Sequence, residues 1–253
     1  ETGKGTGSER LSTISSSTRT SISPVSSFVL TVSSERARTV PRAEVDYLTL
    51  EYLAELTMSI LARLREKDPA AGYAGDFLRV LDSLSGELAR QSQLHVVTNA
   101  GGMNPRGCAA AAAAILCRAG LAELPIGVVT GDDLLPRLDT ILADCPLPHF
   151  ETGQPLGELR QRLVSGNVYL GASPIAAALE QQARIVLTGR VADASLTVGP
   201  AVARFGWPWD DYPMLAAASV AGHLIECGAQ ATGGFYTHWP EIDLAEIGYP
   251  IAE

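Results

Sequence analysis

Short apolar runs alternate with helix-like segments between residues 94 and 188, and this alternation limits the fold more than any other feature of the chain. Runs that predict strands open the segments LHVVTNAGG, PIGVVTGDD and NVYLGASPI, and a further one lies in ARIVLTGR. Between them, segments such as PRGCAAAAAAILCRAGL, with Pro105 near its start and Gly120 at its end, predict helices. Strands that alternate with helices form a parallel sheet covered on both faces. We therefore predict an α/β fold with a parallel, Rossmann-like sheet and helices on both of its faces.

A helical region is predicted in front of this sheet. In the segment 45–68, apolar residues recur at helical spacing and charges gather at the far end. The segment GYAGDFLRVLDSLSGELARQS predicts a second amphipathic helix. In this interpretation Glu51 and Glu55 lie one helical turn apart on a solvated face. Beyond the sheet, one helix is expected to end at Gly206, and the segment 214–230 predicts a longer helix whose small residues permit close packing.

Residues 1–42 differ in composition from the rest of the chain. They contain 11 serines and 7 threonines and few large apolar residues, which is typical of disordered segments. The same segment is rich in arginine and poor in acids, as organelle transit peptides are, so that alternative stays open. The chain begins at Glu1 without a methionine and stops at Glu253 after an apolar stretch, and we expect it to be a fragment. We assign the folded α/β domain to residues 43–253.

Composition argues against several classes of function. The formal net charge is −9 and no basic cluster is present, which argues against a nucleic-acid partner. The four cysteines show no CxxC spacing, so we expect reduced thiols in a cytoplasmic protein and no metal site. No stretch has the apolar length of a membrane span, and we predict no membrane partner.

Three polar or glycine-rich loops follow predicted strands. They are TNAGGMNP (98–105), TGDD (130–133) and TGRVADAS (188–195). In open parallel sheets, ligands bind beyond the carboxyl ends of the strands. We therefore expect these loops to meet and to form one site for a small-molecule substrate.

The first and third loops supply most of the candidate ligand-binding residues. Glycines let backbone amides approach a ligand, a helix N-terminus follows them, and asparagines donate and accept hydrogen bonds. Arg190 can hold a carboxylate or phosphate with two hydrogen bonds, and Asp193 can orient it or act as a base. Alternatively, the glycines only turn the chain, and Arg190 and Asp193 only pair with each other. The predicted ligand-binding residues here are Asn99, Gly101, Gly102, Asn104, Thr188, Gly189 and Arg190.

A second polar cluster lies in GHLIECGAQATGGFYTHW, residues 222–239. His223, Glu226 and Cys227 share one face of a predicted helix, a spacing that suits an acid–base couple. A core histidine beside a buried thiol is the alternative interpretation. We predict Asp193, His223 and Glu226 as catalytic residues. The glycine turn after this helix adds Thr232, Gly233 and Gly234 to the predicted ligand-binding residues.

Several longer motifs follow one another along the chain. They are DYLTLEYLAELTMSILAR, DPAAGYAGDFLRVL, VVTNAGGMNP, VLTGRVADASLTVGP and AGHLIECGAQATGG. Together they resemble the acyclic terpene utilisation protein AtuA family, from about Val45 to Glu253. The resemblance implies a role in bacterial breakdown of acyclic isoprenoids such as citronellol and geraniol, which proceeds through coenzyme A thioesters. It implies family signature positions at 99–105, 188–193 and 223–234, without established catalytic residues.

The chain departs from this family pattern in two places. Family members open with a glycine-rich strand and loop of the kind GxGAGFxGDR, where this chain has its Ser/Thr-rich segment. We therefore expect that the first strand and its loop are lost or replaced. Family chains also continue past the residues that match Glu253, often into a smaller second domain, and we expect this chain to lack that part.

These observations lead to one hypothesis with two rivals. We expect a domain that binds an acyl-type small molecule, with coenzyme A as part of the substrate, and that acts as a hydratase, lyase or isomerase. The first rival is a nicotinamide-dependent oxidoreductase, although NAGGMNPRG is not a GxGxxG fingerprint. The second is a non-catalytic partner subunit whose interaction face is the small-residue helix. We expect a homo-oligomer or an association with other terpene-catabolic enzymes.

Overall fold

The computed structural model describes residues 28–30, 45–243 and 250–252. Within these residues, the strands form one sheet in the order β4-β5-β3-β2-β1-β6. Strands β1 to β5 are parallel, and β6 pairs antiparallel with β1. The predicted α/β fold with a parallel sheet is therefore confirmed. The strands are β1 (Phe28–Leu30), β2 (Tyr47–Leu50), β3 (His95–Thr98), β4 (Ile126–Val129), β5 (Ile185–Thr188) and β6 (Ile251–Ala252).

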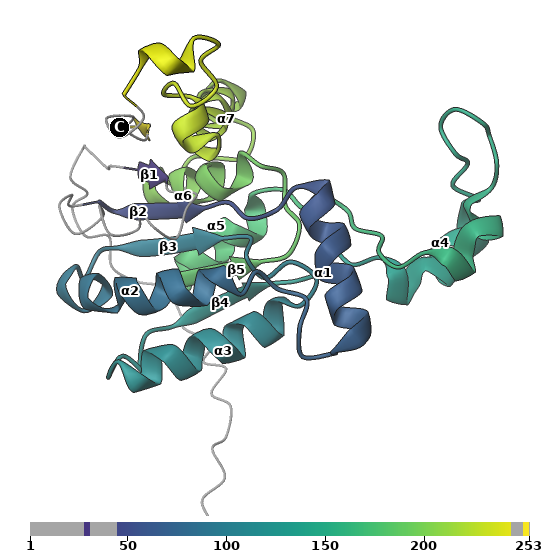
Figure 1. The fold of residues 1–253 in the computed structure, drawn as a ribbon, viewed down its shortest axis with the longest axis horizontal. Coiled ribbons are helices and arrows are strands. Elements are labelled where there is room, and N and C mark those ends of the chain that lie inside the picture. Colours follow the sequence, from purple (N-terminus) through teal and green to yellow (C-terminus); the bar gives the residue numbers. More distant parts are fainter. Residues whose placement is uncertain (1–27, 31–44, 244–249, 253) are drawn as a thin grey trace, which may run out of the picture.

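Helices cover both faces of the sheet, as Figure 1 shows. Successive strand residues point to opposite faces. Accordingly, Leu48 and Val96 pack in the core beneath α2 and α3, whereas Tyr47 and Val97 pack in the core beneath α5, α6 and α7. The buried strands thus supply both cores. The helices are α2 (Asp76–Arg90), α3 (Pro105–Arg118), α5 (Ser173–Glu180), α6 (Ser195–Phe205) and α7 (Tyr212–Glu226).

Several helix ends follow the local sequence signals. Helix α3 begins at Pro105, and the side chain of Asn104 caps it by accepting a hydrogen bond from the Gly107 amide at 3.0 Å. Helix α6 ends where Gly206 adopts a left-handed conformation with φ 65°. In α7, a Cβ atom on Gly222 would lie 2.9 Å from the carbonyl oxygen of Ala194 at the start of α6. The small residues of α7 therefore permit the close helix packing that the sequence predicts.

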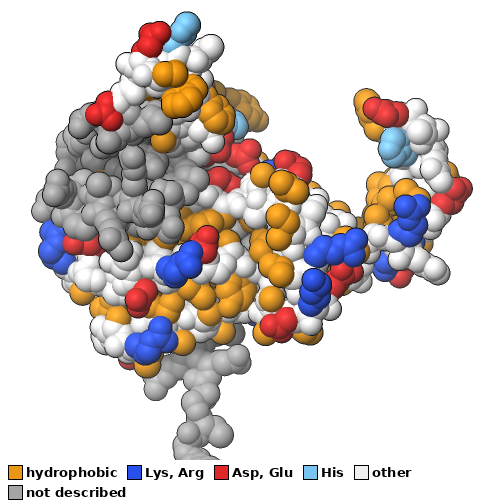
Figure 2. All heavy atoms as spheres, viewed as in Figure 1, with side chains coloured by type: hydrophobic (Ala, Val, Ile, Leu, Met, Phe, Trp, Pro, Cys, Tyr) orange, Lys and Arg blue, Asp and Glu red, His pale blue; other side chains and the backbone are white. Residues whose placement is uncertain are grey.

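Helix α1 (Glu55–Lys67) lies at the carboxyl ends of the strands (Figure 1). Leu61 packs with Met103 of the loop after β3. Arg65 donates a hydrogen bond of 2.6 Å to the carbonyl oxygen of Met103. These contacts hold α1 across the edge of the sheet. The outward side of α1 carries an exposed apolar stripe, visible in Figure 2, formed by Leu56, Ile60 and Leu64.

The connection between β4 and α5 projects from the body of the molecule (Figure 1). It contains α4 (Leu138–Asp144), which follows a short 3-10 helix. The side chain of Asp133 accepts a hydrogen bond of 3.0 Å from the amide of Leu135 at the start of this 3-10 helix. The connection then returns to the body at Asn167, which forms an isolated bridge with Asp133.

Two predicted elements were wrong. The first part of the segment 45–68 contains strand β2 and not helix, because all four residues of YLTL are buried and pair with β1 and β3 on either side. The strand predicted at the start of NVYLGASPI is not a sheet strand. It forms only isolated bridges, such as that between Leu170 and Val191, because β4 already pairs with β5 on that side of the sheet.

The N-terminal segment 1–42 lies largely outside the described residues. Within it, the structure places β1, which pairs in parallel with β2 in the register Phe28 to Tyr47. A strand thus precedes β2 in the sheet, in the part of the chain where we expected the family's first strand to be lost or replaced. Among the residues that the structure describes, no helix combines the length and the apolar character needed to cross a membrane.

Candidate functional site

Three neighbouring strands bring polar residues to one edge of the sheet. Glu51 directly follows β2, Asn99 directly follows β3, and Arg190 lies two residues after β5. The order β2-β3-β5 makes these strand ends adjacent. After β3 the chain enters α3 on one face, and after β5 it enters α6 on the other face. Adjacent strands whose connections leave to opposite faces mark the position where open α/β sheets bind ligands.

Glu51 and Asn99 are joined by a hydrogen bond. The side-chain amide of Asn99 donates to Oε1 of Glu51 at 2.5 Å, and the Leu53 amide donates to the same oxygen at 2.8 Å. Asn99 is fully buried, and its own side-chain oxygen accepts from the amide of Tyr52 at 2.8 Å. Burial raises the pKa of Glu51 to about 7, against the lowering effect of the two hydrogen bonds to its carboxylate.

Arg190 is buried and holds several groups around its guanidinium. Its Nη1 donates to the carbonyl oxygen of Leu53 at 2.6 Å, and its Nη2 lies 3.2 Å from Oδ1 of Asp193. The guanidinium carbon lies 4.1 Å from the ring centroid of Tyr169, a cation–π contact. Exposed Glu55 accepts a hydrogen bond from the Tyr169 hydroxyl. Its Oε1 lies 3.6 Å from Nη2 of Arg190. The predicted pairing of Arg190 with Asp193 is present, and it belongs to a larger network.

Asp132 fixes the backbone of the arginine loop. Its Oδ2 accepts hydrogen bonds of 2.8 Å from the amide of Arg190 and from the side chain of Asn167. A Cβ atom on Gly189 would lie 2.5 Å from both carboxylate oxygens of Asp132, so a side chain at this position would displace that carboxylate. Asp132 thus positions the backbone of Arg190.

Three polar atoms of this network are buried without a hydrogen-bond partner among the described residues. They are Oε2 of Glu51, Nε of Arg190 and Oδ1 of Asp193. The ion pair between Asp193 and Arg190 does not give Oδ1 a hydrogen bond. Buried polar atoms in native proteins nearly always have a partner, either protein or water. The three atoms therefore mark a place where water or a ligand completes the structure.

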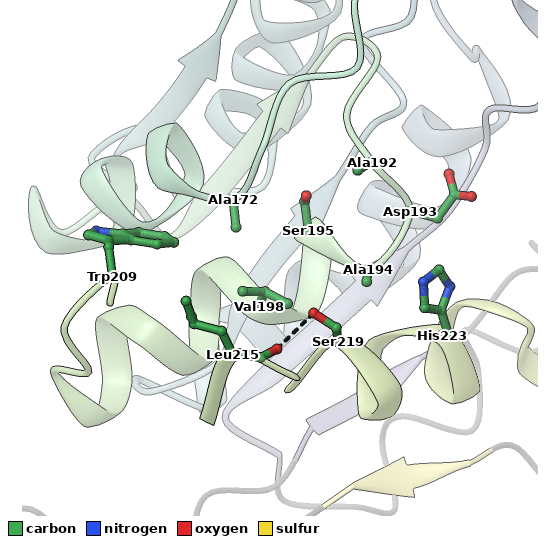
Figure 3. A pocket seen from close by; sticks show the side chains of 10 residues that line it. All are labelled: Ala172, Ala192, Asp193, Ala194, Ser195, Val198, Trp209, Leu215, Ser219 and His223. Atoms are coloured by element: carbon green, nitrogen blue, oxygen red, sulfur yellow. Dashed lines mark hydrogen bonds between the residues drawn. The ribbon is translucent and has the colours of Figure 1, made fainter. Parts of the chain in front are cut away.

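A cavity of about 370 Å³ lies beside this network, between the arginine loop, α6 and α7. Figure 3 shows Asp193 and His223 at one end of it and Trp209 at the other. Ser219, on α7, donates a hydrogen bond of 2.7 Å to the Leu215 carbonyl oxygen. Asp193 belongs both to the cavity wall and to the Arg190 network. The lining residues are Ala172, Ala192, Asp193, Ala194, Ser195, Val198, Trp209, Leu215, Ser219 and His223.

The turn after β3 serves the fold. The Gly102 amide donates to the Asn99 carbonyl oxygen at 3.1 Å, and Gly102 has φ 50° beneath Leu61. A Cβ atom on Gly101 would lie 2.5 Å from the Thr188 carbonyl oxygen. Asn104 donates from its side chain to the carbonyl oxygens of Pro69, Ala70 and Ala71. These contacts favour the alternative that the glycines turn the chain, with Asn104 as a helix cap.

The remaining predicted ligand-binding residues lie outside the cavity wall. Thr188 is buried and donates a hydrogen bond of 2.9 Å to the Gly189 carbonyl oxygen. The Gly234 amide donates to the Ala229 carbonyl oxygen at 2.7 Å, which closes a surface turn after α7. Thr232 and Gly233 belong to the same turn. None of these residues lines the cavity that the structure describes.

The three predicted catalytic residues are only partly brought together. Asp193 and His223 line the cavity, whereas Glu226 does not. Glu226 is the last residue of α7, and its Oε1 accepts a hydrogen bond from the thiol of Cys227 at 3.3 Å. Burial is the largest cause that raises the pKa of Cys227, and Glu226 and Asp193 add to it.

Glu51 is the residue that the sequence analysis missed. The expectation of a solvated helix face was wrong for it, because Glu51 directly follows the buried strand β2 and its carboxylate accepts a hydrogen bond from Asn99. Glu55 does lie exposed, at the first position of α1. One signal was present: the apolar run YLTL followed by an acid repeats the pattern in which HVVT precedes Asn99 and IVLT precedes Arg190.

The fold and the site define an α/β protein with a buried polar network at the carboxyl edge of its sheet and an apolar cavity beside it. The sequence matches the family model of the acyclic terpene utilisation family protein AtuA over residues 21–253, and the chain belongs to this family. The resemblance seen in the sequence is thus confirmed, and the match also includes residues 21–42. Membership connects the chain with acyclic terpene utilisation. No curated protein and no solved structure matches the chain.

Proposed function

We propose that the chain binds an acyl thioester of coenzyme A, with the acyl chain in the cavity. The observation that carries this proposal is a cavity with mostly apolar walls that has Asp193 and His223 at one end (Figure 3). Its volume of about 370 Å³ is within the range of small-molecule sites, about 300–1,000 Å³. The apolar walls suit the hydrocarbon part of such a compound, and family membership supports a ligand from acyclic terpene utilisation.

We further propose a hydratase, lyase or isomerase reaction at this end of the cavity. Dehydration and double-bond isomerisation of an acyl thioester begin when a base removes a proton from the carbon next to the thioester carbonyl. Asp193, whose side chain is 38% exposed, and His223, which is exposed on α7, are the acid–base groups there. The buried guanidinium of Arg190, paired with Asp193, supplies positive charge beside the developing enolate.

Thermal unfolding in the presence of ligand tests this proposal. We expect a ten-carbon terpenoid acyl-CoA to raise the melting temperature by about 5–10 °C at one hundred times its dissociation constant. Ala192→Phe places a large side chain at an exposed position of the wall and should abolish the shift. The matched control is Ala177→Phe, which changes an exposed alanine of α5 outside the wall.

Two results would contradict the proposal. The first is a melting temperature that the acyl-CoA changes no more than buffer does. The second is a shift of equal size in Ala192→Phe and in the unchanged chain. NADH, titrated in parallel, separates the proposal from a nicotinamide-dependent oxidoreductase, because only the latter predicts a change in NADH fluorescence on addition of the chain.

A further inference from the structure

Three atoms without a hydrogen bond among the described residues belong to one network at the sheet edge. Oε2 of Glu51, Nε of Arg190 and Oδ1 of Asp193 are buried without hydrogen bonds in the described part of the chain. Asp193 and Arg190 form an ion pair of 3.2 Å, and the charges of both act on the Glu51 carboxyl group. Three unsatisfied atoms in one network indicate a site for a polar group of a ligand.

The chemistry of the three atoms limits what that group is. Arg190 Nε–H is a donor, whereas Oε2 of Glu51 and Oδ1 of Asp193 are acceptors when their carboxyl groups are ionised. A carbonyl oxygen would satisfy only the donor. A phosphate is negatively charged, so the two carboxylates of Glu51 and Asp193 would repel it. A hydroxyl group accepts from Nε and donates to a carboxylate, so it suits both kinds of atom.

We propose that Glu51, Arg190 and Asp193 form a hydroxyl-binding subsite, and that the ligand is an acyl thioester with a hydroxyl group on its acyl chain. The inference rests on the proposed function, because Asp193 also belongs to the wall of the cavity that holds the acyl chain. In this proposal Glu51, which directly follows β2, contacts the substrate and is a catalytic residue.

With a hydroxyacyl thioester bound in this way, the site supports the removal of water from the acyl chain and the reverse addition of water. Asp193 or His223 takes a proton from the carbon next to the thioester carbonyl, and the electrons of that C–H bond form the new C=C bond. The C–O bond breaks, and its oxygen takes the proton of the Glu51 carboxyl group and leaves as water. Atoms and charge balance without a further reactant. Burial raises the pKa of Glu51 to about 7, so a large fraction of Glu51 carries this proton near neutral pH.

Two matched probes test the subsite by isothermal titration calorimetry. They are β-hydroxyoctanoyl-CoA and octanoyl-CoA, which differ only in the hydroxyl group. We expect the chain to bind the hydroxylated probe at least about tenfold more tightly, because the octanoyl chain leaves the buried polar atoms unpaired. At pH 8.5, above its pKa of about 7, Glu51 is ionised and Oε2 is an acceptor. Glu51→Gln exchanges this acceptor for a donor, so at that pH it should remove the preference and keep the affinity for octanoyl-CoA. Glu180→Gln, an exposed carboxylate of α5, is the control and should keep the preference.

The second measurement uses mass spectrometry to monitor the loss of water from β-hydroxyoctanoyl-CoA. The unchanged chain should form the unsaturated thioester, and Glu51→Gln should form it at least about a hundredfold more slowly. Should Glu51→Gln not fold, Asp193→Asn serves instead, because that side chain is 38% exposed. It should also lower the preference for the hydroxylated probe.

The outcomes separate this inference from the proposed function. Equal affinity of the unchanged chain for both probes overturns the hydroxyl subsite and leaves the acyl-CoA proposal standing. A preference that survives in Glu51→Gln also overturns the subsite. Absence of binding by either probe overturns both proposals together.

Discussion

Asn99 donates a hydrogen bond of 2.5 Å to Glu51, across the ends of two neighbouring strands that lie 48 residues apart in the chain. The bond joins β2 to β3 at the carboxyl edge, where Asn99 has no exposure to solvent. It leaves Oε2 of Glu51 buried without a partner among the described residues. Asn99 therefore positions a carboxyl group that burial keeps partly protonated near neutral pH.

Replacement of Glu51 by glutamine should change how stability depends on pH. The pKa of Glu51 is raised from 4.5 to about 7, so the folded chain binds more protons than the unfolded chain between these values. Its contribution to stability is present below pH 4.5 and is lost as the pH rises through about 7. Glu51→Gln should therefore gain stability relative to the unchanged chain with rising pH, by up to about 3 kcal/mol above pH 7. Urea unfolding at a series of pH values measures the difference.

An exposed carboxylate provides a control of opposite sign for this experiment. The hydrogen bond from Arg160 lowers the pKa of Asp139, so Asp139 stabilises the fold above its ordinary pKa and loses that effect as the pH falls. Asp139→Asn should thus be slightly less stable than the unchanged chain at neutral pH. Parallel pH profiles for Glu51→Gln and the unchanged chain would contradict the buried, partly protonated state of Glu51.

Loss of the Arg190 guanidinium should destabilise the fold. Arg190→Met leaves the carbonyl oxygen of Leu53 without its 2.6 Å hydrogen bond in a buried place. We expect a loss of about 2–3 kcal/mol in the free energy of unfolding, measured in urea. Arg63→Met removes only the exposed pair with Glu66 and should cost less than about 0.5 kcal/mol. Equal losses in the two variants would contradict a structural role for Arg190.

The interpretation of the glycine turn predicts opposite effects at two glycines. In Gly101→Ala the new methyl group meets the Thr188 carbonyl oxygen at 2.5 Å, and we expect a loss of about 2–3 kcal/mol. Gly86 lies inside α2 with open space where a methyl group would lie, so Gly86→Ala should gain about 0.5–1 kcal/mol. Thermal unfolding measures both, and an unchanged melting temperature in Gly101→Ala would contradict the tight packing of this turn.

We predict that Asp132 affects ligand binding indirectly, by holding the loop that carries Arg190. Asp132→Ala leaves the buried amide of Arg190 without its acceptor and frees the side chain of Asn167. We expect the variant to lose about 2 kcal/mol of stability and to bind the acyl-CoA at least about tenfold more weakly. Asp82→Asn, an exposed carboxylate of α2, should change neither quantity. Calorimetric titration that gives the same affinity for Asp132→Ala and the unchanged chain would show that loop position does not matter.

The sheet was predictable where a strand is a short apolar run between turns. HVVT, IGVV and IVLT all form strands, and the segments between them form the helices that cover the two faces. YLTL was mistaken for helix because α1 follows it after only four residues, and apolar residues on both sides of that junction happen to match helical spacing. Whether such a segment follows the two-residue period of a strand or the 3.6-residue period of a helix is decided by its partners in the fold. Here, β1 and β3 pair with β2 on either side and make it a strand.

The sequence predicted that these polar loops meet, but it did not predict the contacts of the individual residues in them. The rule that polar loops gather at the carboxyl edge of a parallel sheet placed Asn99, Arg190 and Asp193 in one region. The rule did not predict that Asn104 and Gly102 make contacts within the fold and do not face a ligand. Their partners are Ala71, in the loop after α1, and Leu61, in α1 itself. Nor could the rule find the Glu51 carboxyl group once the strand before it had been interpreted as helix.

A crystal structure with β-hydroxyoctanoyl-CoA bound tests most directly whether these separate strand ends form one ligand site. We predict the acyl chain in the cavity between Trp209 and His223, with its hydroxyl group within hydrogen-bond distance of Glu51 Oε2 and Arg190 Nε. Density for the ligand on another face, with the cavity empty and both of these atoms still without a partner, would contradict that prediction.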